Sequence, residues 1–471
     1  MIKKRGVALI AASVVVAIGL AGCSQPVATP TGGTTSPTSA APTTASPVQL
    51  TMWTFKQSHV AALEAVGAQC FAGTNVTLKV EAVTPDDTFT TKVQASVQTH
   101  DLPDLLAVHS RDEDWRFAQA GILADITDLF NTKFKDRFND NTLNAMALTQ
   151  QQIDARGDDP ATTIRDLKVG SVYSVPLING AANVVFANKK LLEAAGVDAS
   201  KPPATWEQWA ADAVKVKTHD PNNGGIVTAY QIPGVAYLWF YDPMVTAYMG
   251  FDAYQGRMSK AQTPAWNSRE SVHTLELWDM LTPAWANGVF NLGIDPADQA
   301  FAQGKAAYDL GGTFTLPFLI QQGMSLDDLL VFQAPAPTGS VIPNGTMTTN
   351  PLVSTAITTT STHRVEAEQY LDCLSSPAGA ATFTNVAADL ASPKVDPGAV
   401  QSDALKALAA LFDHPGVPVL NAPWTFSPLT TGDASNQAFE LLGKIAAGQE
   451  TPQSVADQLT KVYKDAWAAE K

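Results

Sequence analysis

Strand-like and helix-like segments alternate along most of the chain. Residues 48–54 and 76–82 alternate apolar and polar side chains, a pattern that predicts strands. Apolar residues at helical spacing over 59–71 and 87–98 predict two helices, and the continuous apolar run 104–108 predicts a buried strand. Strands that alternate with helices form βαβ units, so we expect an α/β fold around a parallel sheet.

Two of these strands end in residues that can contact a ligand. Phe55 and Lys56 follow the first strand, and Arg111 and Asp112 follow the third. Ligands of open α/β sheets bind beyond the carboxyl ends of the strands, so these residues are candidates for a binding site. Alternatively, Arg111 and Asp112 belong to a solvated charged loop, because two more acidic residues follow them directly.

Further elements are predicted in the middle of the chain. Residues 172–177 and 183–189 read as strands, with Asn179-Gly180 as a turn between them. Thr205 has the spacing of an N-cap and predicts a helix after it. The helical spacing of Trp206 and Trp209 indicates that they pack in the core of the fold.

The first 23 residues resemble a lipoprotein signal. Three basic residues precede the uncharged run 6–19, which is shorter than the roughly 20 residues of a membrane-spanning helix and is typical of a signal peptide. Leu20-Ala21-Gly22-Cys23 then resembles the bacterial lipobox. This resemblance implies that residues 1–22 are removed and that Cys23 is lipidated, with palmitate-type chains as a membrane anchor. The alternative is an ordinary secretory signal with a chance cysteine.

Residues 24–47 read as a spacer. They consist almost entirely of Thr, Pro, Ser, Ala and Gly and carry no charge. Such a segment cannot bury enough apolar surface to offset its loss of entropy on folding, and its prolines make it semi-extended. We therefore expect a linker that holds a folded domain away from the membrane.

The charge balance excludes one class of partner. The chain has 30 Lys+Arg against 45 Asp+Glu, and removal of residues 1–22 leaves 27 against 45, a net charge of −18. Sequence-independent nucleic-acid binding depends on Lys and Arg that neutralise phosphates, so we expect no nucleic-acid partner.

Motifs for catalysis and metal binding are missing from the sequence. It contains no Gly-x-Ser-x-Gly, no His-Glu-x-x-His and no Walker lysine loop, and its 7 histidines are scattered. We therefore expect no catalytic residue, no metal and no cofactor. Cys70 and Cys373 can pair in an oxidising compartment, and two buried thiols are an equally acceptable interpretation.

A series of short motifs resembles the extracellular solute-binding proteins of carbohydrate ABC importers, the class typified by maltose-binding protein. No single motif is decisive, and the resemblance rests on their order and spacing over residues 48–471. The motifs are Leu50–Trp53, Leu102–Leu106, Gly121–Ile126, Tyr173–Leu177, Pro203–Gln208, Phe301–Ala307, Gly311–Phe314 and Glu366–Leu374. Thr313-Phe314 stands where the family commonly has Ser-Trp, which bears on the ligand more than on the fold.

The resemblance implies a two-lobed, type II periplasmic-binding-protein-like fold. Each lobe has a central sheet flanked by helices, and a hinge joins the lobes. Lobe one is expected to comprise 48–178 and 336–360, and lobe two 179–335 and 361–471. A ligand binds between the lobes and stabilises their closed arrangement.

The resemblance also implies a sugar as the ligand. Aromatic rings stack on the apolar faces of pyranoses, and amides, carboxylates and charged groups bind their hydroxyls. The expected ligand-binding residues are Phe55, Lys56, Gln57, Arg111, Asp112, Asn179, Trp239, Tyr241, Gly312, Phe314, Asn350 and Trp424.

These features predict a lipid-anchored receptor on the extracellular face of the bacterial membrane. As a monomer without enzymatic activity, it would capture a mono- or oligosaccharide and deliver it to ABC-transporter permease subunits. Two alternatives stay open. One is a glycan-degrading surface lipoprotein, which needs a carboxylate pair that no motif nominates. The other is a binding protein for a polyamine or an anion.

Overall fold

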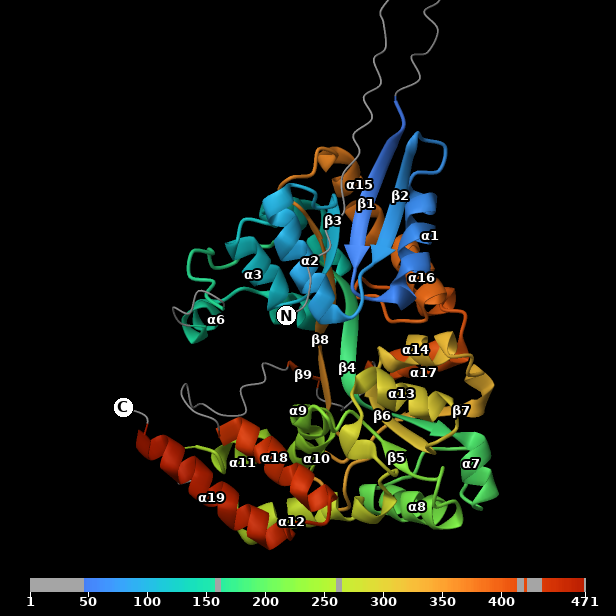
Figure 1. Ribbon diagram of the computed structural model, residues 1–471, viewed down its shortest axis with the longest axis vertical. Coiled ribbons are helices and arrows are strands. Elements are labelled where there is room, and N and C mark those ends of the chain that lie inside the picture. Colours follow the sequence, from blue (N-terminus) through green and yellow to red (C-terminus); the bar gives the residue numbers. More distant parts are fainter. Residues whose placement is uncertain (1–45, 157–161, 260–264, 413–418, 422–433, 470–471) are drawn as a thin grey trace, which may run out of the picture. The chain divides into compact units, whose positions relative to one another are not determined.

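A computed structural model describes residues 46–156, 162–259, 265–412, 419–421 and 434–469 (Figure 1). The chain divides into two units, 1–45 and 46–471, and the description concerns the second unit. Cys23, the expected lipidation site, lies outside the described residues. Within those residues, no helix has the length and apolar character that crossing a membrane requires.

The first sheet forms where the alternating pattern predicts it. Strand β1 (Val48–Thr54) pairs in parallel with β2 (Val76–Ala82) and with β3 (Leu105–His109). Helices α1 (Val60–Cys70) and α2 (Asp86–Thr99) connect these strands. The predicted βαβ arrangement is therefore confirmed, and β1 and β3 end at the same edge of the sheet.

Two long strands continue from this sheet into a second one (Figure 1). Strand β4 (Val175–Asn188) and strand β8 (Met347–Ile357) pair antiparallel, and β8 also pairs with β3. Beyond residue 181, β4 pairs with β6 (Tyr308–Gly312) and β7 (Leu329–Gln333). The short strands β5 (Ile226–Val227) and β9 (Val419–Asn421) pair with β6 and β8, respectively.

The predicted turn at Asn179-Gly180 is wrong, because β4 runs through it without a break. Asn179 and Gly180 pair with Pro351 and Asn350 of β8, and the irregular register lies just before them. A Cβ on Gly180 would come within 1.7 Å of the Leu352 side chain. The glycine thus permits close packing inside a strand here, and does not form a turn.

Helices surround the two sheets, and α8 begins directly after the predicted N-cap Thr205. The remaining α-helices are α3 (Glu113–Gln119), α4 (Thr127–Leu129), α5 (Asp140–Met146), α6 (Gln150–Ala155), α7 (Lys189–Ala194), α8 (Trp206–His219), α9 (Pro233–Ala236), α10 (Asp242–Met249), α11 (Phe251–Gly256), α12 (Arg269–Asp279), α13 (Ile294–Ala302), α14 (Thr315–Gln321), α15 (Arg364–Leu374), α16 (Pro377–Ala387), α17 (Asp403–Phe412), α18 (Ala434–Ala446) and α19 (Pro452–Ala469).

Three apolar cores define what we call lobe 1 and lobe 2. The first core lies around β1, β3 and α1, and the elements that contribute to it form lobe 1. Alternate residues of β4 enter two further cores, with Val185 in one and Val184 in the other. These two cores cover opposite faces of the second sheet, and their elements form lobe 2. Trp206 and Trp209 are fully buried in lobe 2, as their spacing predicts.

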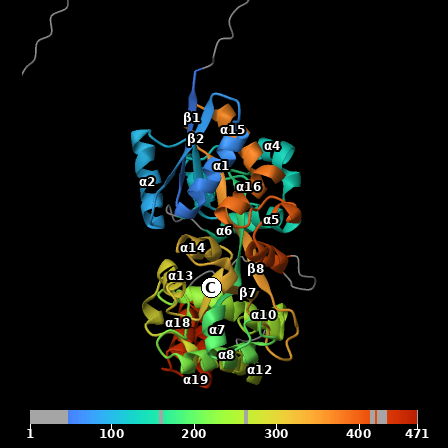
Figure 2. The ribbon, with the colours of Figure 1, turned by 90° about the vertical axis from the view of Figure 1, so that its right-hand side faces the viewer.

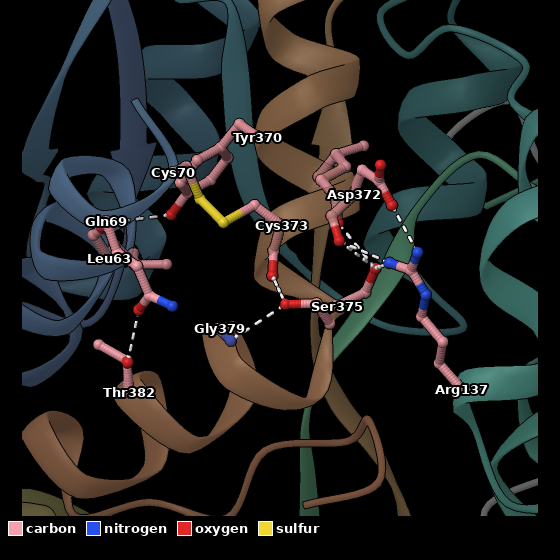
Figure 3. The surroundings of a disulfide bond; sticks show 12 residues. Leu63, Gln69, Cys70, Arg137, Tyr370, Asp372, Cys373, Ser375, Gly379 and Thr382 are labelled. Atoms are coloured by element: carbon pink, nitrogen blue, oxygen red, sulfur yellow. Dashed lines mark hydrogen bonds and ion pairs between the residues drawn. A yellow bond between two sulfur atoms is a disulfide. The ribbon is translucent and has the colours of Figure 1, made fainter. Parts of the chain in front are cut away.

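Helices α15 and α16 pack in lobe 1, although we expected residues 361–471 in lobe two (Figure 2). Tyr370 and Leu371 of α15 are buried in the first core, and the Tyr370 hydroxyl donates a hydrogen bond to the Leu63 carbonyl at 3.1 Å. A disulfide between Cys70 of α1 and Cys373 of α15 joins the same two helices (Figure 3). The structure thus selects the disulfide from the two interpretations that the sequence allowed.

Candidate ligand-binding site

A contact between the two lobes brings Lys56 and Phe314 together. Lys56 follows β1 of lobe 1, and Phe314 lies between β6 and α14 of lobe 2. The Lys56 Nζ atom lies 5.7 Å from the centroid of the Phe314 ring, within the range of a cation–π interaction. Both side chains are half-buried, so each keeps part of its surface accessible. The structure therefore brings together two residues that were nominated separately from the sequence.

Trp239 adds a second aromatic ring at this place. Its ring centroid lies 5.1 Å from that of Phe314, with an angle of 63° between the planes, and the side chain is half-buried. Trp239 lies in η4 (Tyr237–Tyr241), a π-helical turn of a kind often found at functional sites. Together the two rings form a partly exposed apolar surface that is suited to stacking on a sugar.

Gly312 supports the Phe314 ring by its lack of a side chain. A Cβ at this position would lie 2.3 Å from an atom of the Phe314 ring and 2.7 Å from the Ala181 carbonyl oxygen. Gly312 itself is buried. Its contribution to the site is therefore the space that it leaves for the ring of Phe314.

Phe55 lies beneath the surface of lobe 1. Its side chain is buried, and its ring stacks on His109 with centroids 4.1 Å apart and planes at 18°. The edge of the ring also meets Phe89 at 5.7 Å. His109, at the end of β3, is the more exposed member of the stack, and sequence reasoning missed it. The strand-end rule that nominated Arg111 and Asp112 would have reached His109 as well.

Asp112 forms ion pairs with Arg116 and Arg156, which come from two helical segments, and Arg156 also binds the backbone of Arg111. The Asp112 carboxylate accepts hydrogen bonds from Arg116 Nη2 at 2.9 Å and from Arg156 Nη1 at 2.5 Å. Arg156 Nη2 also donates to the Arg111 carbonyl at 2.8 Å. Partial burial opposes ionisation of Asp112, but the bonds from Arg156 and Arg116 outweigh it and hold its pKa below the ordinary value. Arg156 therefore holds the Arg111–Asp112 loop in place, and no sequence pattern indicated this contact.

Asn179 uses its side chain within the hinge region. Its Oδ1 accepts a hydrogen bond from Ser392 Oγ at 2.9 Å, and its Nδ2 donates to Thr142 Oγ1 at 3.1 Å. Asn179 also lines a pocket of about 410 Å³ together with Asn139 and Lys394. The amide thus holds the crossing strand against its neighbours.

Tyr241 lies inside the core of lobe 2. It is fully buried, its hydroxyl is 3.0 Å from Thr274 Oγ1, and its ring meets Trp278 edge-on at 5.9 Å. Burial raises the pKa of Tyr241 above its ordinary value. The structure therefore places this aromatic residue in packing, not beside Trp239 on the accessible surface.

The remaining expected residues are placed less completely. Gln57 is exposed in η1 (Gln57–His59), directly after Lys56. The backbone of Asn350 pairs with Gly180, and its side chain lies outside the described part of the structure. Trp424 also lies outside the described residues.

Comparison with known families identifies the class of protein. Residues 56–381 match a family described as bacterial extracellular solute-binding protein. The chain belongs to this family. Binding proteins of Brucella abortus and Brucella suis are 27% identical to this solute-binding protein over 254 residues. The match covers 52% of this chain and 52% of each relative, so the chain spans about half the length of the curated relatives it matches.

Solved structures share the fold of this solute-binding protein. A protein from a study of xylan utilization by Caldanaerobius polysaccharolyticus has a TM-score of 0.63 at 19% identity, covering 88% of this chain and 99% of that one. The GacH receptor of Streptomyces glaucescens, solved without ligand and with acarbose, has a TM-score of 0.60 at 15% identity, covering 90% and 100%. RafE in complex with raffinose has a TM-score of 0.58 at 15% identity, covering 89% and 99%. The expected two-lobed α/β fold is confirmed.

Proposed function

We propose that this solute-binding protein captures a mono- or oligosaccharide between its lobes and delivers it to the permease of an ABC importer. The observation that carries the proposal is the group formed by Lys56, Phe314 and Trp239. It combines residues of both lobes, so a ligand that touches all three favours one arrangement of the lobes. No chemical step is needed for this role, and we assign the protein no enzymatic activity.

The chemistry of these side chains suits a sugar. Two half-buried aromatic rings supply a surface for the apolar face of a pyranose, and the Lys56 ammonium group can donate hydrogen bonds to hydroxyls. The solved structures of GacH with acarbose and of RafE with raffinose, which have the same fold, support a ligand of this class. We expect a dissociation constant in the micromolar range or below, equivalent to about −8 kcal/mol.

The proposal includes attachment to the membrane through Cys23. Residues 20–23 have the order of a lipobox, and the uncharged segment 24–47 provides a spacer to the folded unit. The receptor then works as a monomer on the extracellular face of the membrane. Labelling of cells with a palmitate analogue should mark the wild-type protein, and Cys23→Ala should abolish the label. A labelled Cys23→Ala protein would refute the anchor.

Calorimetric titration of the purified protein tests the binding function. The panel contains galactose, maltose, raffinose and xylotetraose, and at least one of them should bind with 1:1 stoichiometry. Chromatography of the same mixtures should recover each sugar unchanged, because a receptor leaves its ligand intact. Absence of binding across mono-, di- and oligosaccharides would contradict the proposal, and release of a cleavage product would replace it with a glycan-degrading function.

A further inference from the structure

A buried histidine–aspartate pair connects the loop that carries Lys56 to a distant part of the chain. His59 Nε2 lies 3.0 Å from Asp389 Oδ2, and both side chains are fully buried. The two residues are 330 positions apart in sequence. His59 is the last residue of η1, which starts directly after Lys56. The backbone of the candidate site is therefore tied by one buried polar contact to the segment that contains Asp389.

The hydrogen bonds around the pair define the protonation of His59. The Asp389 Oδ1 atom accepts a bond from the Leu390 amide at 2.9 Å, which leaves Oδ2 to accept from His59 Nε2–H. Within the described part of the chain, His59 Nδ1 has no hydrogen-bond partner, and the Phe383 ring meets the imidazole edge-on at 5.2 Å. A neutral ring with its proton on Nε2 satisfies this arrangement, while a proton on Nδ1 would have no acceptor.

The charges near His59 agree with a neutral ring. Burial lowers the pKa of His59, the hydrogen bond and charge of Asp389 oppose this effect, and the positive charge of Lys56 adds to it. Because the folded state favours the neutral form, the contribution of His59 to stability is present above pH 6.5 and is lost as the pH falls.

Asp389 belongs to a segment that runs along the crossing strand β4. The Leu390 carbonyl accepts a hydrogen bond from the Asn179 amide at 3.2 Å, and the Ser392 amide donates to the Leu177 carbonyl at 2.8 Å. Ile178 and Ala391 form a β-bridge between these two contacts. The segment therefore follows β4 where that strand passes from lobe 1 to lobe 2.

We propose that the His59–Asp389 pair positions the Lys56–Ser58 loop against the crossing strand, so that the loop is held for ligand binding only while His59 is neutral. The part that concerns binding rests on the function proposed above for Lys56. His59 and Asp389 are positioning residues here, because both are buried and act through the loop. Protonation of His59 places an N–H group at Nδ1 without an acceptor, which loosens the loop at acid pH.

Amide exchange in the ligand-free protein tests whether the His59–Asp389 pair holds the Lys56–Ser58 loop, without any sugar. Asp389→Asn presents an amide N–H to His59 Nε2, so the ring must carry its proton on the unpartnered Nδ1. We expect hydrogen–deuterium exchange of the amides of residues 55–60 to rise about tenfold at pH 7.5. His59→Gln keeps a donor near the position of Nε2 and should exchange like the wild type. His59→Gln should also lack the fall in the protection factors of these amides that we expect for the wild type between pH 7.5 and pH 5, after correction for the intrinsic exchange rates.

The double variant His59→Gln/Asp389→Asn provides the rescue. A glutamine carbonyl can accept from the asparagine amide, so exchange of residues 55–60 should return to within about twofold of wild type. His363→Gln is the matched control, because His363 also contacts an aspartate, Asp104 at 3.2 Å, outside this segment. If Asp389→Asn does not fold, the pH comparison of wild type with His59→Gln and the double variant still decides the question.

Binding of raffinose and xylotetraose provides the second measurement. Asp389→Asn should weaken whichever of these sugars binds the wild type by about tenfold, with recovery in the double variant. The proposed role of the His59–Asp389 pair would be overturned if exchange of residues 55–60 were unchanged in Asp389→Asn. It would also be overturned if the double variant did not restore wild-type exchange. If the wild type binds neither these sugars nor the other panel members, the proposed function fails. The exchange data still test whether the His59–Asp389 pair holds the loop.

Discussion

The carboxyl groups of Asp298 in α13 and Asp309 in β6 contact each other in the interior of lobe 2. Both side chains are buried, and neither oxygen of Asp309 accepts a hydrogen bond from an N–H or hydroxyl group of the described residues. Burial raises the pKa of Asp309 to about 7 and raises that of Asp298 well above its ordinary value. Asp295 adds to the effect on Asp298, and Lys56 opposes it. Between about pH 4 and pH 7 the pair is therefore protonated in the folded state, whereas aspartates of the unfolded chain are ionised.

This pair should make the protein less stable at alkaline pH. The folded state binds more protons than the unfolded state, so stability is lost as the pH rises from about 4 through about 7. Asp309→Asn removes one titrating group and should raise the free energy of unfolding at pH 8 by about 2–4 kcal/mol relative to wild type. Urea denaturation at pH 5 and pH 8 measures this, with Asp327→Asn as control, because Asp327 is exposed in lobe 2 and does not act on the pair. If Asp309→Asn changed the free energy of unfolding equally at both pH values, the raised pKa of this pair would be contradicted.

Removal of the Phe314 ring should weaken sugar binding without unfolding the protein. Phe314 is half-buried and contacts both Trp239 and Lys56, so Phe314→Ala removes a stacking surface and a cation–π contact. We expect a loss of about 1–2 kcal/mol in binding, roughly five- to thirtyfold in the dissociation constant. Calorimetry with the best ligand of the sugar panel measures it, and Phe290→Ala, at an exposed aromatic residue of lobe 2, is the control. Equal affinity of Phe314→Ala and wild type would remove Phe314 from the site.

A side chain at position 312 should disturb the site through Phe314. In Gly312→Ala the new Cβ would lie 2.3 Å from the Phe314 ring, which must move, and 2.7 Å from a backbone oxygen of β4, which cannot move freely. We expect a loss of about 1–3 kcal/mol in unfolding free energy together with weaker sugar binding. Thermal melts and calorimetry report the two effects. Gly443→Ala, where a Cβ inside helix α18 meets nothing within 4 Å, should leave sugar binding unchanged and should not lower the free energy of unfolding.

The disulfide between Cys70 and Cys373 should stabilise lobe 1. It closes a loop of 303 residues and joins α1 to α15 across the first core. Replacing both cysteines with serine should lower the free energy of unfolding by about 2–5 kcal/mol, since the unfolded chain gains freedom. Denaturation of wild type with and without a reductant gives the same comparison without mutation. A double variant as stable as the oxidised wild type would show that helix packing alone holds α15 in place.

Local patterns in the sequence were sufficient for the regular elements. Alternation at 48–54 and 76–82 predicted β1 and β2, and the N-cap at Thr205 predicted the start of α8. The order and spacing of the short motifs resemble those of carbohydrate-binding solute receptors, and this resemblance implied the two-lobed fold that the comparisons confirm. Lys56 could be nominated because it follows a strand end, and Trp239 and Phe314 because the resemblance implies aromatic platforms at these positions.

Other features depend on contacts between distant residues. Asn179-Gly180 has the composition of a turn, but pairing with β8 keeps it in a strand. Phe55 and Tyr241 have the side chains of ligand platforms, but His109 covers the first and the core of lobe 2 encloses the second. Arg156 braces the Arg111–Asp112 loop from another helical segment, so no short pattern could reveal it.

By itself, the sequence determined the regular elements, because periodicity and capping act over a few positions, while its resemblance to a known family supplied the two-lobed fold and most of the candidate residues. Only the tertiary structure decided which candidates meet at an accessible surface. It also paired Cys70 with Cys373 and His59 with Asp389. The physical reason is that burial and pairing depend on distances in space, and these follow from how β4 and β8 join the two lobes.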